Sequence, residues 1–316
     1  MARPDRRTEL SDEISSLAPV NIEAELSVVA DHFAGAAARQ SAAAVEPELA
    51  DLDLVVCDEL DFGAMAAGRS AGVPVVVVSV VASGALVRRD RIGDALDRLR
   101  AELGLSQPIR YRGDLFVVPF APMMRDPRFP APEDAVWMRP DAGREPEPDG
   151  SLVVTLGTEF NTESGDLFDR ILAAIAELSF PAVVAVGRDL DPARFGPQSS
   201  HVRVEQYVDL GALVPHASVV LHHGGSGLFL QSVLGGAPQI VFPMGADQPF
   251  TAKRVQQLGV GLVLDPITAP PVDILNAIAE LHSDADTRTR VLDLRAETLA
   301  LPEPSAVIPY LDALVR

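Results

Sequence analysis

The feature that most constrains the fold is an alternation of short apolar runs with helical segments, joined by turns of a few residues. Five apolar runs of this kind lie in the C-terminal half, at 151–156, 182–186, 202–205, 218–222 and 239–242. The N-terminal half holds a shorter version of the pattern, with runs at 53–58 and 75–81. A strand, a helix and a second strand with short links form a βαβ unit, whose strands pair in parallel. The sequence therefore predicts an α/β fold with two parallel sheets.

A stretch rich in Pro, Asp and Gly separates the two halves and predicts the domain boundary. Residues 1–140 are expected to form an N-terminal Rossmann-like domain, followed by a linker over 141–150. Residues 151–304 are expected to form the C-terminal domain. The final segment, 305–316, is expected to be a helix that packs back on the N-terminal domain.

Charge and composition exclude several classes of partner. The 316 residues carry a formal net charge of −19, so neither nucleic acid nor an anionic membrane surface is an expected partner. No apolar run approaches the ~20 residues of a membrane-spanning helix. The N-terminus lacks the apolar core of a signal peptide, and the single cysteine gives no disulfide framework. A cytoplasmic protein is the expectation, with no cofactor and, for want of an Asp-x-Asp-type cluster, no metal.

The most informative segment is a strand at 218–222 that runs into His223-Gly224-Gly225-Ser226-Gly227 and then into a helix. Glycines let the backbone approach a ligand closely. The start of the helix offers unpaired N–H groups and a partial positive charge, which suit a phosphate. A Gly-rich turn between strand and helix can also be purely structural, so the residues that follow it carry weight.

Those residues are Gly236-Ala-Pro-Gln239, then Asp247-Gln248, then Ala252-Lys-Arg-Val255. In this order and spacing after the Gly-rich turn, they resemble the donor-binding signature of the GT-B glycosyltransferases. The resemblance is greatest to the family-1 enzymes that decorate antibiotics and other natural products in actinomycetes, and it runs from about Asp51 to the end. It implies a GT-B-like fold, with two Rossmann-like domains facing each other and the N-terminal one truncated.

The resemblance also implies a role for each matched position. His223 would hydrogen-bond the donor diphosphate, and Asp247 and Gln248 would hold the sugar hydroxyls. Tyr207 and Val208 would lie at the nucleobase, and Gly157 and Thr158 would form a first phosphate-facing turn. The implied donor-binding set is Gly157, Thr158, Tyr207, Val208, His223, Gly224, Gly225, Ser226, Gly227, Asp247 and Gln248.

This sequence departs from the family pattern at three positions. Leu228 and Phe229 replace the usual Thr or Ser, so a hydroxyl contact to phosphate is lost. Asp209 replaces the usual Pro and would bring a negative charge near the nucleotide.

Several of these residues also have a structural interpretation. His222 is expected to be a satisfied histidine at a strand end, and Asp247 could simply cap a turn. A zinc site from His216, His222 and His223 is disfavoured, because adjacent strand residues point to opposite faces.

The catalytic apparatus that the resemblance implies is only half present. The family uses a histidine as general base, oriented by an aspartate at a strand end. Asp58 matches that aspartate, with a strand-end or capping role as the alternative. Residues 1–50 contain no apolar strand and no counterpart of the histidine, and His32, in an expected helix, is a poor replacement. The N-terminal domain is therefore expected to be incomplete.

The implied activity is an inverting transfer of a sugar from a UDP- or TDP-type donor to a hydroxyl of a small hydrophobic natural product. The alternatives are a catalytically impaired nucleotide-sugar-binding helper, or one half of a split glycosyltransferase. A nucleotide-sugar epimerase of the same fold fits Asp247-Gln248 less well. A homodimer or a partner chain could cover the edge of the truncated sheet.

Overall fold

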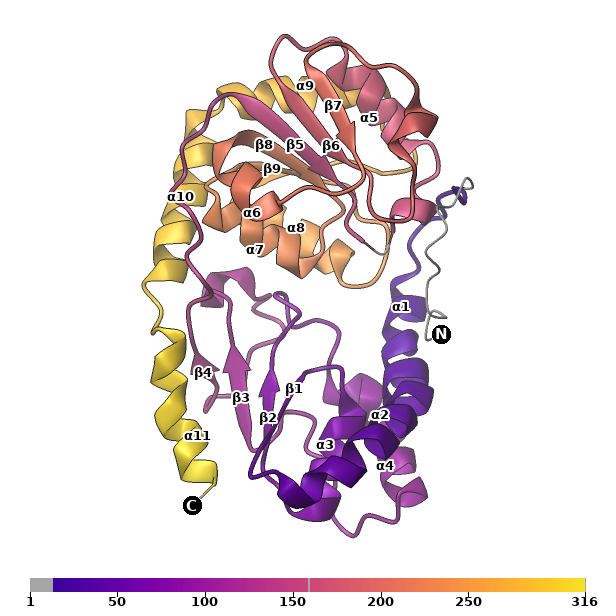
Figure 1. The fold of residues 1–316 in the computed structure, drawn as a ribbon, viewed down its shortest axis with the longest axis vertical. Helices are drawn as coiled ribbons and strands as arrows, with labels where there is room; N and C mark the ends of the chain where they lie inside the picture. The colour runs from indigo at the N-terminus through magenta and orange to yellow at the C-terminus, as the bar shows by residue number, and fades with distance from the viewer. Residues whose placement is uncertain (1–13, 159, 316) are drawn as a thin grey trace. The chain divides into compact units, whose positions relative to one another are not determined.

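The computed structural model describes residues 14–158 and 160–315, which divide into two compact units. The first unit comprises Asn21–Pro140 and the residues from Thr298 onward. The second comprises Asp141–Glu297 and the described residues up to Val20. Each unit contains one parallel sheet with its own helices (Figure 1).

The first unit has a four-stranded sheet in the order β1-β2-β3-β4. Its strands are β1 (Val55–Asp58), β2 (Val75–Val78), β3 (Leu115–Val118) and β4 (Val136–Trp137). Its α-helices are α1 (Ile22–Val28), α2 (Ala38–Val45), α3 (Phe62–Ala71), α4 (Arg89–Glu102) and α11 (Ile308–Leu314). Shorter or non-α helical turns are η1 (Val29–Ala37), η2 (Glu46–Asp51), η3 (Pro122–Met124) and η7 (Pro304–Val307).

Helices cover both faces of this first sheet. Figure 1 shows α11 along one side of it and α2, α3 and α4 gathered on the other. Val76 and Val117 face α11, where they pack with Val307 and Leu311. The helix predicted over 305–316 thus lies within the first unit, on the sheet that the sequence placed in the N-terminal domain.

The second unit has a six-stranded parallel sheet in the order β10-β9-β8-β5-β6-β7. Its strands are β5 (Ser151–Thr155), β6 (Ala182–Ala185), β7 (Val202–Glu205), β8 (Ala217–His222), β9 (Gln239–Val241) and β10 (Gly261–Val263). Its α-helices are α5 (Leu167–Ile175), α6 (Leu210–Leu213), α7 (Ser226–Leu234), α8 (Gln248–Leu258), α9 (Pro271–Ser283) and α10 (Ala285–Leu299). Short 3-10 turns are η4 (Asn161–Glu163), η5 (Pro192–Phe195) and η6 (Val214–His216).

The side chains of the central strands alternate between the two faces of this sheet. Leu152 and Val154 of β5 belong to the large core that includes residues of α5 and α9. Val153, between them, packs on the opposite face with Val214 and Val220. The chain runs from β5 to β6 on one side and later returns to β8 on the other. In open parallel sheets such a reversal leaves a crevice at the carboxyl ends of the strands, which is where ligands bind.

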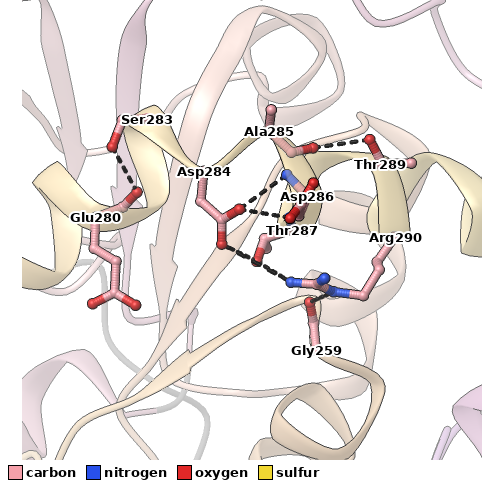
Figure 2. A network of polar contacts seen from close by, with 9 residues as sticks. All are labelled: Gly259, Glu280, Ser283, Asp284, Ala285, Asp286, Thr287, Thr289 and Arg290. Carbon is pink, nitrogen blue, oxygen red and sulfur yellow. Dashed lines mark hydrogen bonds and ion pairs between the residues drawn. The ribbon is translucent and has the colours of Figure 1, made fainter.

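A polar network fixes the end of α9 and the start of α10, where the chain turns between the two helices (Figure 2). Asp284 accepts hydrogen bonds from the backbone N–H groups of Asp286 and Thr287 and from the Thr287 hydroxyl. Arg290 donates to the Thr287 hydroxyl at 2.6 Å and to the carbonyl of Gly259 at 2.7 Å. The network caps α10 and ties it to the end of α8.

The structure corrects the expected boundaries in two places. The segment 141–150, predicted to be a linker, is held on the second unit: Glu147 N donates to Pro215 O, and Asp149 N donates to His216 O. Residues 14–20, assigned to the N-terminal domain, also belong to the second unit, because Ser15 exchanges backbone hydrogen bonds with Thr162 and Gly165. Residues 1–13 of that predicted domain lie outside the described residues.

Across the described ranges, no helix combines the length and apolar character needed to cross a bilayer.

Candidate functional site

A cavity of about 490 Å³ opens at the carboxyl edge of the second sheet. Turns that follow five of its strands supply the walls: Gly157, Thr158 and Phe160 after β5, Gly187 and Arg188 after β6, Gln206, Tyr207 and Val208 after β7, His223, Gly225, Gly227 and Leu228 around β8 and α7, and Ala246, Asp247 and Gln248 after β9. We call it the donor pocket. It lies at the reversal of strand order described above, and it brings together nine of the eleven predicted donor-binding residues. The other two, Gly224 and Ser226, are not among the residues that line it.

Two glycines in these turns have backbone conformations that L side chains rarely adopt. Gly224 has φ of +95°, and a Cβ there would lie 2.8 Å from Val241 Cγ1. Gly157 has φ of +77°, and a Cβ there would overlap the ring of His223. Both positions therefore require glycine, the first for the turn and the second to make room for the imidazole.

Helix α7 begins at the floor of the donor pocket with no side-chain cap at Gly225. The first backbone hydrogen bond of the helix runs from Phe229 N to Gly225 O, so the N–H groups of Gly227 and Leu228 have no partner within the helix. Nothing lies within 4 Å of a Cβ added at Gly227, so this residue faces open space. The helix start therefore presents its amides and its partial positive charge to the cavity, as an anion site requires.

His222 is fully buried and has a structural role. Its Nδ1 accepts a hydrogen bond from Gly224 N at 3.0 Å. Its Nε2 must then carry the proton, which it donates to Gln239 Oε1 at 2.8 Å. Burial lowers the pKa of His222 to about 4. These contacts agree with the interpretation of His222 as a satisfied strand-end histidine.

His223 points into the donor pocket. Its ring stacks on Phe160, with the centroids 6.2 Å apart, and lies between Gly157 and Gly225. Its Nδ1 is buried and has no hydrogen-bond partner. Burial, and secondarily the neighbouring His222, lowers the pKa of His223 to about 3. The imidazole is therefore neutral near pH 7, and a ligand in the cavity can pair its buried nitrogen.

Ser226, Asp247 and Gln248 are committed to contacts within the protein. The Ser226 hydroxyl donates to Asp247 Oδ2 at 2.5 Å. Burial raises the pKa of Asp247. The side-chain oxygen of Gln248 accepts from Met244 N at 2.7 Å and Gly245 N at 3.1 Å. The Ser226 hydroxyl is thus bonded to Asp247. The side-chain oxygen of Gln248 is bonded to the loop after β9, so its amide nitrogen is the atom of this side chain that could donate to a ligand.

The three departures from the family pattern have different consequences. Leu228 lines the donor pocket, so the cavity wall has an apolar side chain where the family pattern has a Thr or Ser hydroxyl. Phe229 is fully buried in the core and never reaches the cavity. Asp209 is not among the lining residues; its carboxylate accepts from Ala212 N at 3.2 Å and caps α6. The expectation that Asp209 brings a negative charge near the nucleotide stays a prediction, since Val208 and Leu210 on either side of it line the cavity.

The part of the donor pocket around Tyr207 contains one residue that was not predicted from the sequence, Arg188. Tyr207 is 66% exposed, and the guanidinium carbon of Arg188 lies 5.4 Å from the centre of its ring. The carbonyl of Arg188 accepts from Gln206 Nε2 at 2.6 Å. Arg188 is the one cation among the described residues that line this cavity.

Ala246, in the loop after β9, was also missed. Within the described residues it is the one non-glycine residue with positive φ, at 51°. It lines the donor pocket between the Gln248-bound amides and Asp247. A non-glycine residue in this region is strained, and such strain is found most often at functional sites.

In the first unit, Asp58 ends β1 and is exposed. Its carboxylate accepts from Leu60 N at 2.7 Å, which is the capping role named as the alternative. His32 lies in η1 and packs edge-on against Phe33. Within the described residues, no contact joins His32 to Asp58.

The buried carboxylate at the end of β1 is that of Glu59, a residue that was not predicted from the sequence. It accepts from the hydroxyl of Ser79 and from Val80 N and Val81 N. Burial raises its pKa against these hydrogen bonds. Glu59 therefore ties the end of β1 to the loop after β2 and is not free to take a proton from a ligand.

Among the described residues, no group of three His, Cys, Asp or Glu side chains is placed to hold a metal ion. His216, named for a possible zinc site, bonds through its Nδ1 to the carbonyl of Glu147 at 3.0 Å.

Comparison with known proteins agrees with this geometry. Residues 169–314 match the C-terminal domain of the erythromycin biosynthesis protein CIII-like family. A 10-deoxymethynolide desosaminyltransferase of Streptomyces venezuelae is 28% identical over 186 residues, which are 58% of this chain and 43% of the relative. The chain thus matches less than half of that relative's length.

Two solved structures share the fold over most of the chain. The glycotransferase of kitacinnamycin superposes with a TM-score of 0.75 at 22% identity, covering 94% of this chain and 84% of its own. The glycosyltransferase VinC in complex with DTDP gives 0.72 at 21% identity, covering 92% and 79%. Residues 169–314 thus resemble the C-terminal domain of the EryCIII-like family, and the α/β fold of the chain is the GT-B fold of these solved glycosyltransferases.

Proposed function

We propose that this protein binds a nucleoside-diphosphate sugar in the donor pocket and serves in its transfer to a hydroxyl of a small natural-product acceptor. The observation that carries the proposal is the start of α7, whose uncapped amides open onto the cavity beside the unpartnered Nδ1 of His223. A diphosphate offers acceptors for both. The match to the EryCIII-like domain and the DTDP bound by VinC support the same class of ligand.

In this proposal the residues of the donor pocket act mainly on the leaving group. Inverting transfer breaks the bond between the anomeric carbon and the diphosphate oxygen while the acceptor oxygen attacks from the opposite face. The negative charge that develops on the diphosphate is stabilised by the N–H groups of Gly227 and Leu228 and by a proton on His223. In this proposal, the amide nitrogen of Gln248 and the carboxyl of Asp247 hold sugar hydroxyls.

The histidine and aspartate pair that the resemblance implies for the acceptor side does not form among the described residues. Asp58 is exposed and caps its own turn, and His32 does not contact it. General-base assistance contributes about 10²- to 10⁴-fold to such a transfer. This observation favours a second candidate: a nucleotide-sugar-binding helper, or one half of a split glycosyltransferase whose partner supplies the base.

The edge of the first sheet fits that second candidate. Among the described strands, β1 pairs only with β2, and Val56 on β1 is 58% exposed. An open strand edge is a template for pairing with another chain, either a second copy or a partner protein.

A paired binding and transfer experiment separates the two candidates. UDP, dTDP and their sugar conjugates would be titrated calorimetrically, and the same donors would be assayed for transfer and for donor hydrolysis. Binding with turnover supports the enzyme, and binding without turnover supports the helper or split form. Absence of binding by every nucleotide would contradict both.

A further inference from the structure

The first unit contains a second cavity, of about 580 Å³, whose lining includes four arginines. It is formed by the start of α4, the segment before β3 and the loop after η3. Four guanidinium groups line it, those of Arg88, Arg89, Arg112 and Arg128, against the carboxylates of Asp90 and Glu133. In a chain of net charge −19, this excess of cations is local and runs against the overall field.

Two of these four guanidinium groups, those of Arg88 and Arg128, have a carboxylate oxygen within 4 Å. Arg128 pairs with Asp126 at 2.6 Å. The nearest carboxylate oxygen to Arg88 Nε, that of Asp90, is 3.9 Å away, and Arg88 Nε is buried without a hydrogen bond. In the described part of the chain, Arg112 forms no ion pair.

Aromatic rings contact three of these guanidinium groups, those of Arg88, Arg112 and Arg128. Arg88 and Arg128 lie 4.8 and 5.1 Å from the centre of the Phe129 ring. Arg112 lies 5.3 Å from the centre of the Tyr111 ring. Stacking on a ring orients a guanidinium plane while leaving its N–H groups and its charge available to a ligand.

A buried arginine stands directly behind this cavity. Arg125 is 6% exposed, and its guanidinium packs against Gly84, which lines the cavity. Its Nε donates to the carbonyl of Phe129 at 2.8 Å, but its Nη1 is buried and has no partner. Burial, and the nearby charge of Arg112, lower the pKa of Arg125 against the pull of Glu59. Glu59 offsets part of this positive charge, but the buried Nη1 of Arg125 still lacks a hydrogen-bond acceptor.

We propose that this cavity binds the oxyanion group of a small molecule, a phosphate or a carboxylate, with Arg88 and Arg112 as its principal ligands. Arginine forks match both groups in shape and charge, and the cavity is large enough for a molecule that carries either one. The inference does not rest on the proposed function of the second unit, because every residue involved belongs to the first.

The single tryptophan of the chain, Trp137, lies on β4 in the same unit and provides a local signal. Trp137 fluorescence would be followed while inorganic phosphate or benzoate is added at constant ionic strength, with chloride as the reference salt. We expect a saturable change with at least one of the two anions. Preference for phosphate identifies a phosphorylated ligand, and preference for benzoate identifies a carboxylate-bearing one.

Variants assign the signal to the cavity. Arg112→Gln and Arg88→Gln should each weaken binding by about tenfold or more, the loss of one charge-assisted contact, and Arg112→Lys should recover part of it. Arg203→Gln removes the same charge from an exposed residue of the second unit and should leave binding unchanged.

Thermal unfolding of each variant shows whether the substitution has changed the stability of the fold. The proposal is overturned by the absence of a saturable change with either anion, by binding that chloride reproduces, or by equal loss in Arg203→Gln. A folded Arg88→Gln, Arg112→Gln double variant that binds normally would also overturn it.

Discussion

The two units meet the same physical problem, polar side chains at the carboxyl end of a parallel sheet, in different ways. In the second unit, the turns after five strands converge on one cavity, where His223 Nδ1 is buried without a partner. In the first unit, Asp58 stands exposed at the end of β1, bonded to its own turn. This difference shows that a residue at a motif position, such as Asp58, does not by that position alone form a binding site. Neighbouring turns have to leave a group buried, aimed at a space and unpaired.

The largest expected effect on nucleotide affinity comes from a substitution at Gly227, in the donor pocket of the second unit. A valine there meets no protein atom within 4 Å of its Cβ, so it should fill the donor pocket without disturbing the fold. We expect Gly227→Val to weaken nucleoside-diphosphate binding by about 100-fold or more, since the ligand must displace the side chain from the helix start. Calorimetry measures the loss, and thermal unfolding should be unchanged.

Gly224→Val is the matched contrast. Its φ of +95° and the closeness of Val241 predict that this variant loses stability as well as binding. Should Gly227→Val bind nucleotide normally, the helix start is not the phosphate site.

A smaller effect is expected from removing His223. His223→Ala should weaken diphosphate binding by about 1–3 kcal/mol, because one hydrogen bond to a charged acceptor is lost. Asp58→Asn in the first unit should leave nucleotide affinity unchanged, since its carboxylate contacts only its own turn. The comparison between the units fails if both variants change the affinity equally, or if neither changes it.

The two buried histidines predict a dependence of stability on pH. Burial lowers the pKa of His222 to about 4 and that of His223 to about 3, whereas an unfolded histidine titrates near 6.5. Below pH 6.5 the unfolded chain therefore binds more protons than the folded one, so stability is full above that pH and falls as the pH decreases towards 4. Each histidine should contribute a loss of up to about 2 kcal/mol between pH 7 and 5.

Urea unfolding at pH 7 and pH 5 measures this loss. His223→Gln should reduce the difference, while replacement of the exposed His282 by Gln should not. An equal pH dependence in the wild type and in His223→Gln would show that His223 has the same pKa in the folded and unfolded protein, contrary to this account.

The smallest effect is expected at Ala246, whose φ of 51° strains a non-glycine residue. Ala246→Gly should raise the free energy of unfolding by up to about 1 kcal/mol, as the cost of the left-handed conformation is removed. A clear loss of stability, read from chemical denaturation, would show that the Ala246 methyl group makes a contact worth more than the strain.

Much of the fold could be predicted from the sequence, because its strands are continuous apolar runs and its helices have regular periodicity. The two-residue strand β4 (Val136–Trp137) escaped notice, since a run that short between prolines has no pattern of its own. The packing of residues 14–20 and 141–150 on the second unit was also hidden, because backbone hydrogen bonds between distant segments leave no mark on local sequence.

Some features of the candidate site could likewise be predicted from the sequence, and others could not. The Gly-rich turn was visible in the sequence, and one of its glycines, Gly224, does have a positive φ that favours glycine. The bond between Ser226 and Asp247 joins residues 21 positions apart and could not be read from spacing. Arg188 and Ala246 enter the donor pocket only through the tertiary fold. The individual donor contacts, the absence of a cofactor and the cytoplasmic location remain predictions.

The most direct test of the central claim is to observe the backbone amides at the start of α7 while nucleotide binds. In protein labelled with ¹⁵N-glycine, a nucleoside diphosphate should shift the amide protons of Gly225 and Gly227 downfield in proportion to occupancy, with Gly104 of the first unit unmoved as a reference. Saturable nucleotide binding that leaves Gly225 and Gly227 unchanged would place the diphosphate elsewhere and contradict the account.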